Sequence, residues 1–146
     1  MLNKIISLGL LTLVSATVWA KPNTSDPMYS TDESLQKLYD QVEATETPKK
    51  ITENLILTST EVEMGGLRIR RVYQYTNINI DKLTADEAQL LSAKATASLA
   101  SQCDEQNDVI KKGITFRHLF RDKNGLMISV VDIEKNRCDY FKALSK

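Results

Sequence analysis

The sequence has little of what most catalytic sites are built from. It holds one histidine and two cysteines in 146 residues. It has no Gly-x-Ser-x-Gly or His-Glu-x-x-His motif and no phosphate-binding glycine-rich loop. The turn Asp122-Lys123-Asn124-Gly125 begins like a calcium loop, but Val131 stands where that loop needs its bidentate acid. These absences predict a protein that is not an enzyme and that carries no metal or cofactor.

An excess of charge of one sign is also missing. Lys and Arg together number 19, and so do Asp and Glu. A chain balanced in this way favours neither nucleic acid nor an anionic membrane surface as its partner. We therefore expect the partner to be a protein or a cell-surface component.

Long apolar runs are absent after the first twenty residues. Residues 1–20 have the three parts of a signal peptide: Lys4 near the start, an apolar run from Ile5 to Val14, and Val18-Trp19-Ala20 before the cut. The alternative, an uncleaved membrane anchor, is disfavoured because the run is short for a bilayer span. We expect cleavage after Ala20 and an exported chain, periplasmic or secreted, that has no membrane anchor once processed.

The exported chain is long enough for one domain with a core of its own. Residues 21–29 hold two prolines and few apolar side chains, which is typical of a flexible leader. We expect a single domain over residues 30–146. In an exported chain, two cysteines predict one disulfide, Cys103 to Cys138. A metal site built on these thiols, or a free reactive thiol, is the weaker alternative.

Residues 114–133 show the pattern of a β-hairpin. Apolar and polar residues alternate from Ile114 to Arg121, and Asn124-Gly125 is a strong signal for a two-residue turn. A turn at Asn124-Gly125 sets three cross-strand pairs, Phe120 with Ser129, His118 with Val131 and Phe116 with Ile133. A turn at Lys123-Asn124 would shift the partners by two and keep the faces. Either register predicts one apolar surface, and we expect it to be the core: Ile114, Phe116, Phe120, Met127, Val131 and Ile133.

Residues 53–64 and 67–80 predict a second hairpin around Gly65-Gly66. This turn pairs Glu63 with Arg68 and Glu61 with Arg70 on one face. On the other face it pairs Val62 with Ile69 and Met64 with Leu67. Further from the turn, it places Ile56 opposite Tyr75 and Thr58 opposite Tyr73.

Three helices are expected around the hairpins. The first follows a capping box of Ser30 and Glu33, the longest follows Thr84-Ala85-Asp86-Glu87, and a short one covers residues 104–112 before Gly113. Residues 139–144 can add a helical tail. The fold class is therefore α+β: a single antiparallel four-stranded sheet of two hairpins, in the order α-β-β-α-α-β-β, with helices packed on it as a sandwich closed by one disulfide.

A candidate binding surface follows from the second hairpin. Arg71 lies on the face opposite to the paired arginines, beside Tyr73 and Tyr75, and arginine next to tyrosine is a common recognition pair. A packing or capping role for Arg71 is equally open. His118 joins this set as the sole histidine. Its use as a general base in a hydrolase is a minor alternative, because no nucleophile or orienting acid has a recognisable spacing to it.

The stretch from Cys103 through Ile114-Thr115-Phe116-Arg117-His118-Leu119-Phe120 and the Asp122 to Gly125 turn to Cys138 resembles a family of small exported proteins of Gram-negative bacteria. These proteins are assigned as quorum-sensing-regulated virulence factors. The resemblance implies an exported α/β protein without established catalytic residues. We therefore expect a non-enzymatic protein that binds another macromolecule, with a role in virulence or adhesion. The alternative is a periplasmic accessory protein or small-ligand-binding protein.

Overall fold

The computed structural model describes residues 31–146. The expected signal peptide, its cleavage site, the leader and the start of the domain at residue 30 lie outside the described residues. The elements are α1 (Glu33–Glu43), β1 (Lys49–Thr52), β2 (Leu55–Glu63), the 3-10 turn η2 (Met64–Gly66), β3 (Arg68–Tyr75), the 3-10 turn η3 (Ile80–Lys82), α2 (Ala85–Leu99), α3 (Gln102–Glu105), α4 (Asn107–Lys111), β4 (Thr115–Arg121), β5 (Met127–Ile133) and α5 (Lys135–Leu144). Within 31–146 no helix has the length and apolar character that a membrane span requires.

The sheet has five strands in the order β1-β2-β3-β4-β5, and it is mixed. β3 and β4 run parallel, while the other neighbours are antiparallel. The prediction of a four-stranded, fully antiparallel sheet was therefore wrong. The chain leaves β3 at Tyr75 and passes through α2, α3 and α4 before β4 begins at Thr115, and a helical crossover of this kind returns the chain to the end from which β3 started.

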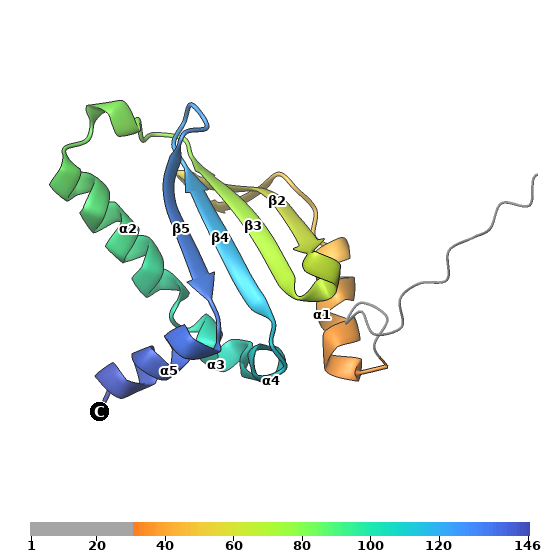
Figure 1. Ribbon diagram of the computed structural model, residues 1–146. Coiled ribbons are helices and arrows are strands. Elements are labelled where there is room, and N and C mark those ends of the chain that lie inside the picture. The colour runs from red at the N-terminus through yellow and green to blue at the C-terminus, as the bar shows by residue number, and fades with distance from the viewer. Residues whose placement is uncertain (1–30) are drawn as a thin grey trace, which may run out of the picture.

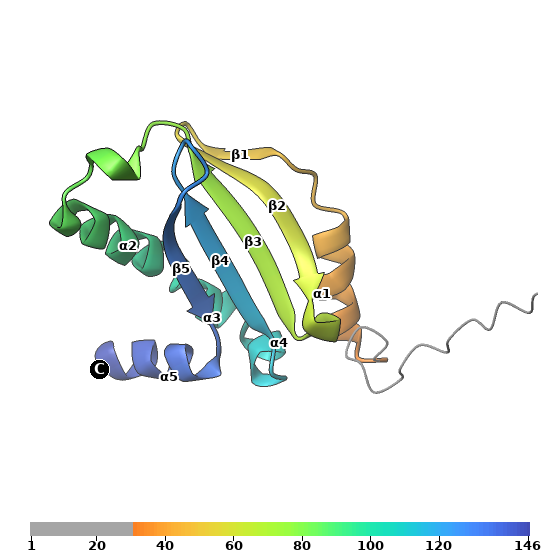
Figure 2. The same cartoon turned by 45° about the horizontal axis from the view of Figure 1, so that its top comes forward.

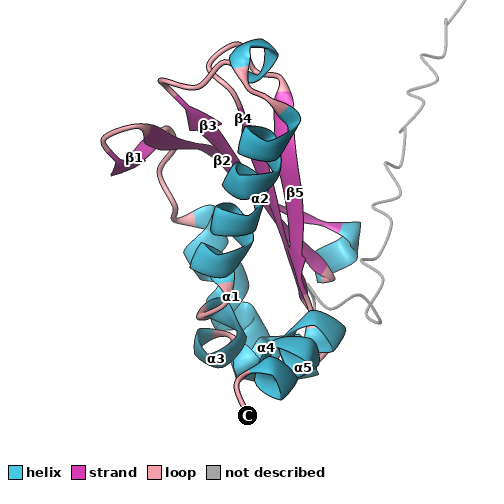
Figure 3. Cartoon of the chain, turned by 90° about the vertical axis from the view of Figure 1, so that its left-hand side faces the viewer, coloured by secondary structure: helices cyan, strands magenta, loops and turns pink. Residues whose placement is uncertain are grey.

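The helices cover one face of the sheet and leave the other open (Figures 1 and 3). α1 packs against β2 and α2 packs against β5. Figure 2 shows β1 as the outer strand at one edge of the sheet, with β5 at the opposite edge. The protein is thus a two-layer α/β structure, and the face toward the viewer in Figure 1 has no second layer.

The core lies between the sheet and the helices. Most of the predicted core surface is confirmed, because Ile114, Phe116, Phe120, Val131 and Ile133 are all buried. The assignment of Met127 to the core was wrong, because its side chain is 44% exposed. It begins the edge strand, where the register shifts between Phe120 and Arg121. α1 adds a stripe of four buried side chains at helical spacing, Leu35, Leu38, Tyr39 and Val42.

Both hairpins form, and each contains one register shift. β4 and β5 pair as the Asn124-Gly125 turn predicts, with Phe116 opposite Ile133 and His118 opposite Val131. Near the Gly65-Gly66 turn, the predicted pairs Glu63–Arg68, Val62–Ile69 and Glu61–Arg70 are confirmed. The predicted pair of Met64 with Leu67 is wrong, because β2 ends at Glu63 and Met64 lies in η2. Further along, Ile56 pairs with Gln74 and Leu57 with Tyr73, because a bulge between Leu57 and Ser59 shifts the register.

The helix predictions were confirmed in part. Thr84 and Glu87 form the predicted capping box of α2. Ser30 lies outside the described residues, and Asp32 caps α1 by accepting from the backbone N–H groups of Ser34 and Leu35. The expected helix over 104–112 is broken into α3 and α4. The helical tail is longer than expected and forms α5.

The disulfide between Cys103 and Cys138 is confirmed. The two Cα atoms are 5.4 Å apart, and both side chains are buried. Cys103 lies in α3 and Cys138 in α5, so the bond joins two helices. It attaches α5, which follows the edge strand β5, to the crossover segment.

Candidate functional site

The structure brings the four predicted binding residues together on the helix-covered face. Arg71, Tyr73 and Tyr75 alternate along β3, and His118 lies opposite Arg71 on β4. Tyr73 is 8% exposed and His118 is fully buried, while Arg71 and Tyr75 are half-buried. Any ligand that approaches this cluster therefore reaches Arg71 and Tyr75 first.

Ring stacking holds this cluster together. The Tyr73 ring lies 5.0 Å from the Phe120 ring and 5.8 Å from the His118 ring, close to parallel with both. The Arg71 guanidinium lies over Phe116, 5.7 Å from the ring centre. Burial raises the pKa of the Tyr73 hydroxyl, and Arg71 partly offsets that rise. The cluster thus packs the core and places one arginine among aromatic rings.

His118 is held as a neutral side chain. Burial, together with the nearby Arg71 charge, lowers its pKa to about 3. Its Nε2 lies 2.9 Å from Gln102 Oε1, and because that oxygen only accepts, Nε2 carries the proton. Within residues 31–146, Nδ1 has no hydrogen-bond partner. An imidazole with this pKa and no orienting acid is poorly suited to act as a general base at neutral pH.

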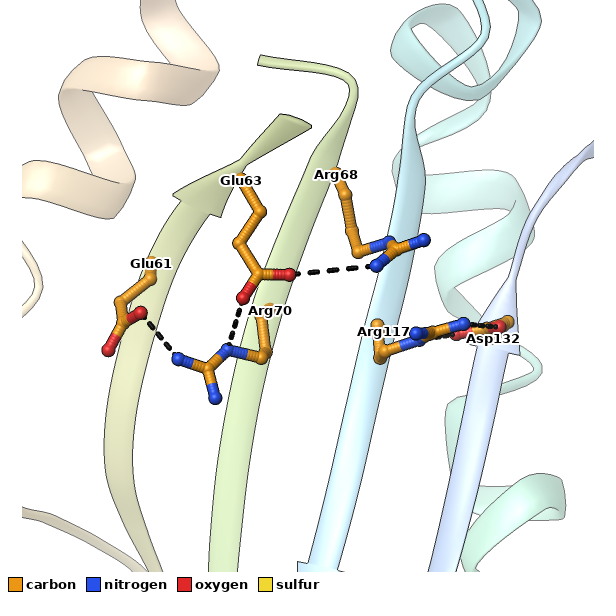
Figure 4. A network of polar contacts seen from close by, with 6 residues as sticks. All are labelled: Glu61, Glu63, Arg68, Arg70, Arg117 and Asp132. Carbon is orange, nitrogen blue, oxygen red and sulfur yellow. Dashed lines mark hydrogen bonds and ion pairs between the residues drawn. The ribbon is translucent and has the colours of Figure 1, made fainter. Parts of the chain in front are cut away.

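The open face carries a row of charged side chains across four strands (Figure 4). Glu61, Arg70, Arg117 and Asp132 occupy neighbouring register positions on β2, β3, β4 and β5. Arg117 donates two hydrogen bonds to Asp132, from Nε at 2.8 Å and Nη2 at 2.7 Å. Arg117 therefore holds the pKa of the Asp132 carboxyl below its usual value.

The arginines of β3 complete this network. Arg70 contacts Glu61 and also Glu63, whose Oε1 lies 2.6 Å from Arg70 Nε. Arg68 Nη1 lies 3.7 Å from Glu63 Oε2. The predicted pairs of Glu61 with Arg70 and Glu63 with Arg68 are both confirmed. The Arg117–Asp132 pair was missed, although the predicted register of the hairpin over residues 114–133 already placed these residues opposite each other.

An apolar row runs beside the charged row on the same face. Val72, Leu119 and Val130 are register neighbours on β3, β4 and β5. Their exposure rises toward the edge: Val72 is buried, Leu119 is half-buried and Val130 is 50% exposed. Arg121 follows Leu119 on this face of β4, and among the described residues it makes no ion pair. Over residues 31–146, the open face thus combines arginines held in ion pairs, Arg121 without an ion pair, and an apolar row whose exposure rises toward β5.

Metal-binding groups do not gather in the described part of the chain, where no cluster of three His, Cys, Asp or Glu side chains could hold an ion. A hollow of about 280 Å³ lies between α1 and α4. Its lining is mixed, with Lys37 and Gln41 on one side and Glu105 and Asp108 on the other. This hollow offers polar contacts at the surface, without an enclosed cavity for a cofactor.

No family model matches the sequence, and no curated protein matches it either. The resemblance to the quorum-sensing-regulated family therefore stays a prediction.

Three solved structures are similar to the chain. A Pseudomonas aeruginosa protein assigned as secreted has a TM-score of 0.51 and 14% sequence identity, over 71% of this chain and 88% of its own. The type II secretion system pilotin of Vibrio cholerae has a TM-score of 0.48 and 18% identity, over 73% and 96%. The corresponding pilotin of Vibrio vulnificus has a TM-score of 0.49 and 14% identity, over 72% and 87%. At these identities the likeness to the Pseudomonas protein concerns the fold alone.

Proposed function

We propose that this chain is an exported protein that acts by binding another protein, and that the open face of its sheet makes the contact. The export part of this proposal is supported by the signal-peptide pattern of residues 1–20 and by the disulfide, which forms in oxidising compartments.

The observation that carries the proposal is that the charged row and the apolar row lie side by side on the open face. Protein interfaces favour arginine and apolar side chains at their centre. Here Arg70 and Arg117 are held by carboxylates, so little side-chain entropy remains to be lost when a partner binds. Leu119 and Val130 offer apolar contact next to them. Arg121 adds a positive charge without an ion-pair partner in the described residues.

This arrangement defines the chemistry of the partner. Its surface would carry apolar side chains over Leu119 and Val130, with a carboxylate placed to meet Arg121. A role in adhesion or virulence is a more specific form of the same proposal. A loss of attachment or infection on deletion of the gene would support such a role.

The experiment is photo-crosslinking in the native host, with a benzophenone amino acid in place of Leu119. A control chain carries the same group at Lys37 on α1, on the covered side of the protein. We expect a discrete adduct with one other protein from position 119 only. The identified partner, once purified, should bind Arg121→Glu at least about tenfold more weakly than wild type. Equal adducts from both positions, or unchanged binding by Arg121→Glu, would contradict the proposal.

The cluster of Arg71, Tyr73, Tyr75 and His118 remains a second proposal, as a site for a small anionic ligand. The half-buried Arg71 and Tyr75 support it, since they are the members within reach of solvent. Native mass spectrometry of the purified protein tests it. A retained metabolite that Arg71→Gln releases would favour this role, and an empty wild-type protein would argue against it.

A further inference from the structure

One half of β2 has no strand on its outer side. β1 pairs only with residues 55–57 of β2, and Pro48, directly before β1, has no backbone N–H with which to extend that pairing. Residues 59–63 pair with β3, and within residues 31–146 no strand lies on their other side. In a strand paired on one side, every second residue points its N–H and C=O groups away from the sheet. Residues 59–63 therefore form an unpaired sheet edge.

A groove lies between this edge and α1. In Figures 1 and 2, α1 lies beside the second half of β2, on the side away from β3. The space between them, the α1–β2 groove, has a volume of about 440 Å³. The residues of α1 and β2 that line it include Tyr39, Val42, Glu43, Thr60, Glu61 and Val62. An exposed sheet edge beside such a groove is suited to take up an extended peptide as an added strand, because the edge binds the peptide backbone and the groove binds its side chains.

The two faces of this edge offer different side chains to an added strand. Thr60 and Val62 lie on the helix-covered face, as their partners on β3 do, and they share the α1–β2 groove with Tyr39. Glu61 lies on the open face, at the end of the charged row (Figure 4). Successive side chains of an extended peptide point to opposite faces of the sheet. Its side chains would therefore meet the groove and the Glu61 carboxylate in alternation.

The charges and hydrogen bonds of the groove indicate what its occupant carries. Among the described residues, the charged groups that line it are Glu43 and Glu61, with no lysine or arginine. Glu61 is bound to Arg70, but its side chain is still 53% exposed and can accept from a second cation. Thr60 Oγ1 is buried, and within residues 31–146 it has no hydrogen-bond partner. A bound segment with a positive charge and a polar group near Thr60 would supply both missing contacts.

We propose that the α1–β2 groove binds an extended segment of another protein, which pairs as an added strand with residues 59–63. Apolar side chains of the segment alternate with basic ones. The apolar side chains pack against Tyr39 and Val62, and a lysine or arginine lies beside Glu61. This contact uses neither Leu119 nor Arg121, so it does not depend on the open-face contact proposed above.

The test begins with a random library of peptides displayed on phage, selected on the immobilised, disulfide-bonded protein. We expect enriched sequences in which apolar residues alternate with lysine or arginine. A synthetic peptide of the enriched sequence should bind Glu61→Gln at least about fivefold more weakly than wild type. Thr45→Trp, which fills the groove from the end of α1, should weaken binding at least about tenfold. Glu105→Gln, in the hollow between α1 and α4, is the matched control and should bind as wild type does. Circular dichroism of each variant confirms that the fold is intact.

Peptides with N-methylated backbone amides distinguish an added strand from other modes of binding. Only every second N–H group of an added strand faces the edge that it pairs with. Methylation of alternate amides should therefore weaken binding at least about tenfold in one phase and less than about threefold in the other. Equal losses in the two phases, as expected for a peptide bound as a helix, would overturn the proposal.

Amide exchange measured by NMR locates the bound peptide. In the saturated complex, the amides of residues 59–63 that point away from β3 should exchange at least about tenfold more slowly than in the free protein. A selection that enriches no peptide would overturn the proposal, and so would protection gained only outside β2. Neither result bears on the crosslink from position 119, so this proposal and the open-face contact can fail separately.

Discussion

The carboxylate of Asp122, at the end of β4, accepts a hydrogen bond from the backbone N–H of Ile80 at 3.1 Å. The same carboxylate accepts from the N–H groups of Asn124 at 2.8 Å and Leu126 at 2.9 Å. Asp122 is fully buried and belongs to the β4–β5 turn, whereas Ile80 is the first residue of η3, which precedes α2. One side chain therefore connects the β4–β5 turn to the segment that starts the crossover.

The substitution Asp122→Asn tests how much this connection stabilises the protein. An amide keeps one accepting oxygen but turns an N–H donor toward other donors, so at least one buried backbone N–H loses its partner. We expect the midpoint of thermal unfolding to fall by roughly 5 °C or more. Circular dichroism measures it, with Glu53→Gln as an exposed control that should leave the midpoint unchanged. Equal midpoints for Asp122→Asn and wild type would show that the carboxylate does not hold the loop.

His118 makes stability depend on pH. Its pKa is about 3 in the folded chain, against an ordinary value of 6.5, so below pH 6.5 the unfolded chain binds more protons than the folded one. The free energy of unfolding is therefore highest above pH 6.5 and falls as the pH drops toward 3. Between pH 6 and 4.5 we expect a loss of about 2 kcal/mol in urea titrations.

His118→Gln provides the control for this pH dependence. It removes the only histidine while keeping a group that can bond to Gln102, and carboxylates titrate mainly below this pH range. The variant should show a nearly flat free energy of unfolding between pH 6 and 4.5. If its slope equalled that of the wild type, the pH dependence would come from other groups.

The disulfide should contribute strongly to stability. Cys103→Ser with Cys138→Ser opens a covalent loop of 35 residues, and the chain-entropy model gives a loss of about 3–4 kcal/mol for such a loop. α5 should lose amide protection before the sheet does, because Cys138 is its one fully buried residue. Urea titration and amide exchange measure the two effects. A reductant should destabilise the wild type and leave the variant unchanged.

The Arg117–Asp132 pair should matter little for stability. Both side chains are partly exposed, and pairs of this kind contribute about 0.2–1 kcal/mol. A double-mutant cycle with Arg117→Gln and Asp132→Asn measures the coupling energy. A coupling above about 2 kcal/mol would show that the open face is more rigid than its exposure suggests.

Local signals in the sequence were enough for the two hairpin turns, the capping box of α2 and the disulfide. Asn124-Gly125 and Gly65-Gly66 specify hairpins through a few residues, and Thr84 with Glu87 specifies the start of α2. Alternation then places His118 and Phe116 on the buried side of β4. Each of these features depends on residues that are close in sequence.

The remainder depends on contacts that no local pattern encodes. The pairing of β3 with β4 joins segments on either side of the whole crossover, and either direction satisfies the alternation of both strands. The bulge after Leu57 shifts the register of β2 against β3 by one residue, and no glycine or proline at this point of the sequence indicates it. β1 was missed because its four residues are all exposed and show no alternation. Asp122 was recognised as a turn residue, but its bond to Ile80 depends on the crossover.

The parallel neighbours β3 and β4 also set the order in which the protein can be completed. As the chain emerges from its N-terminus during synthesis, the β2–β3 hairpin is available long before Thr115 exists. Until then the central strand β3 has one unpaired side, and Ile69 and Tyr73 lack their neighbours on β4, Phe116 and Phe120. Nascent chains would therefore remain targets for chaperones and proteases until the last third of the protein has been made.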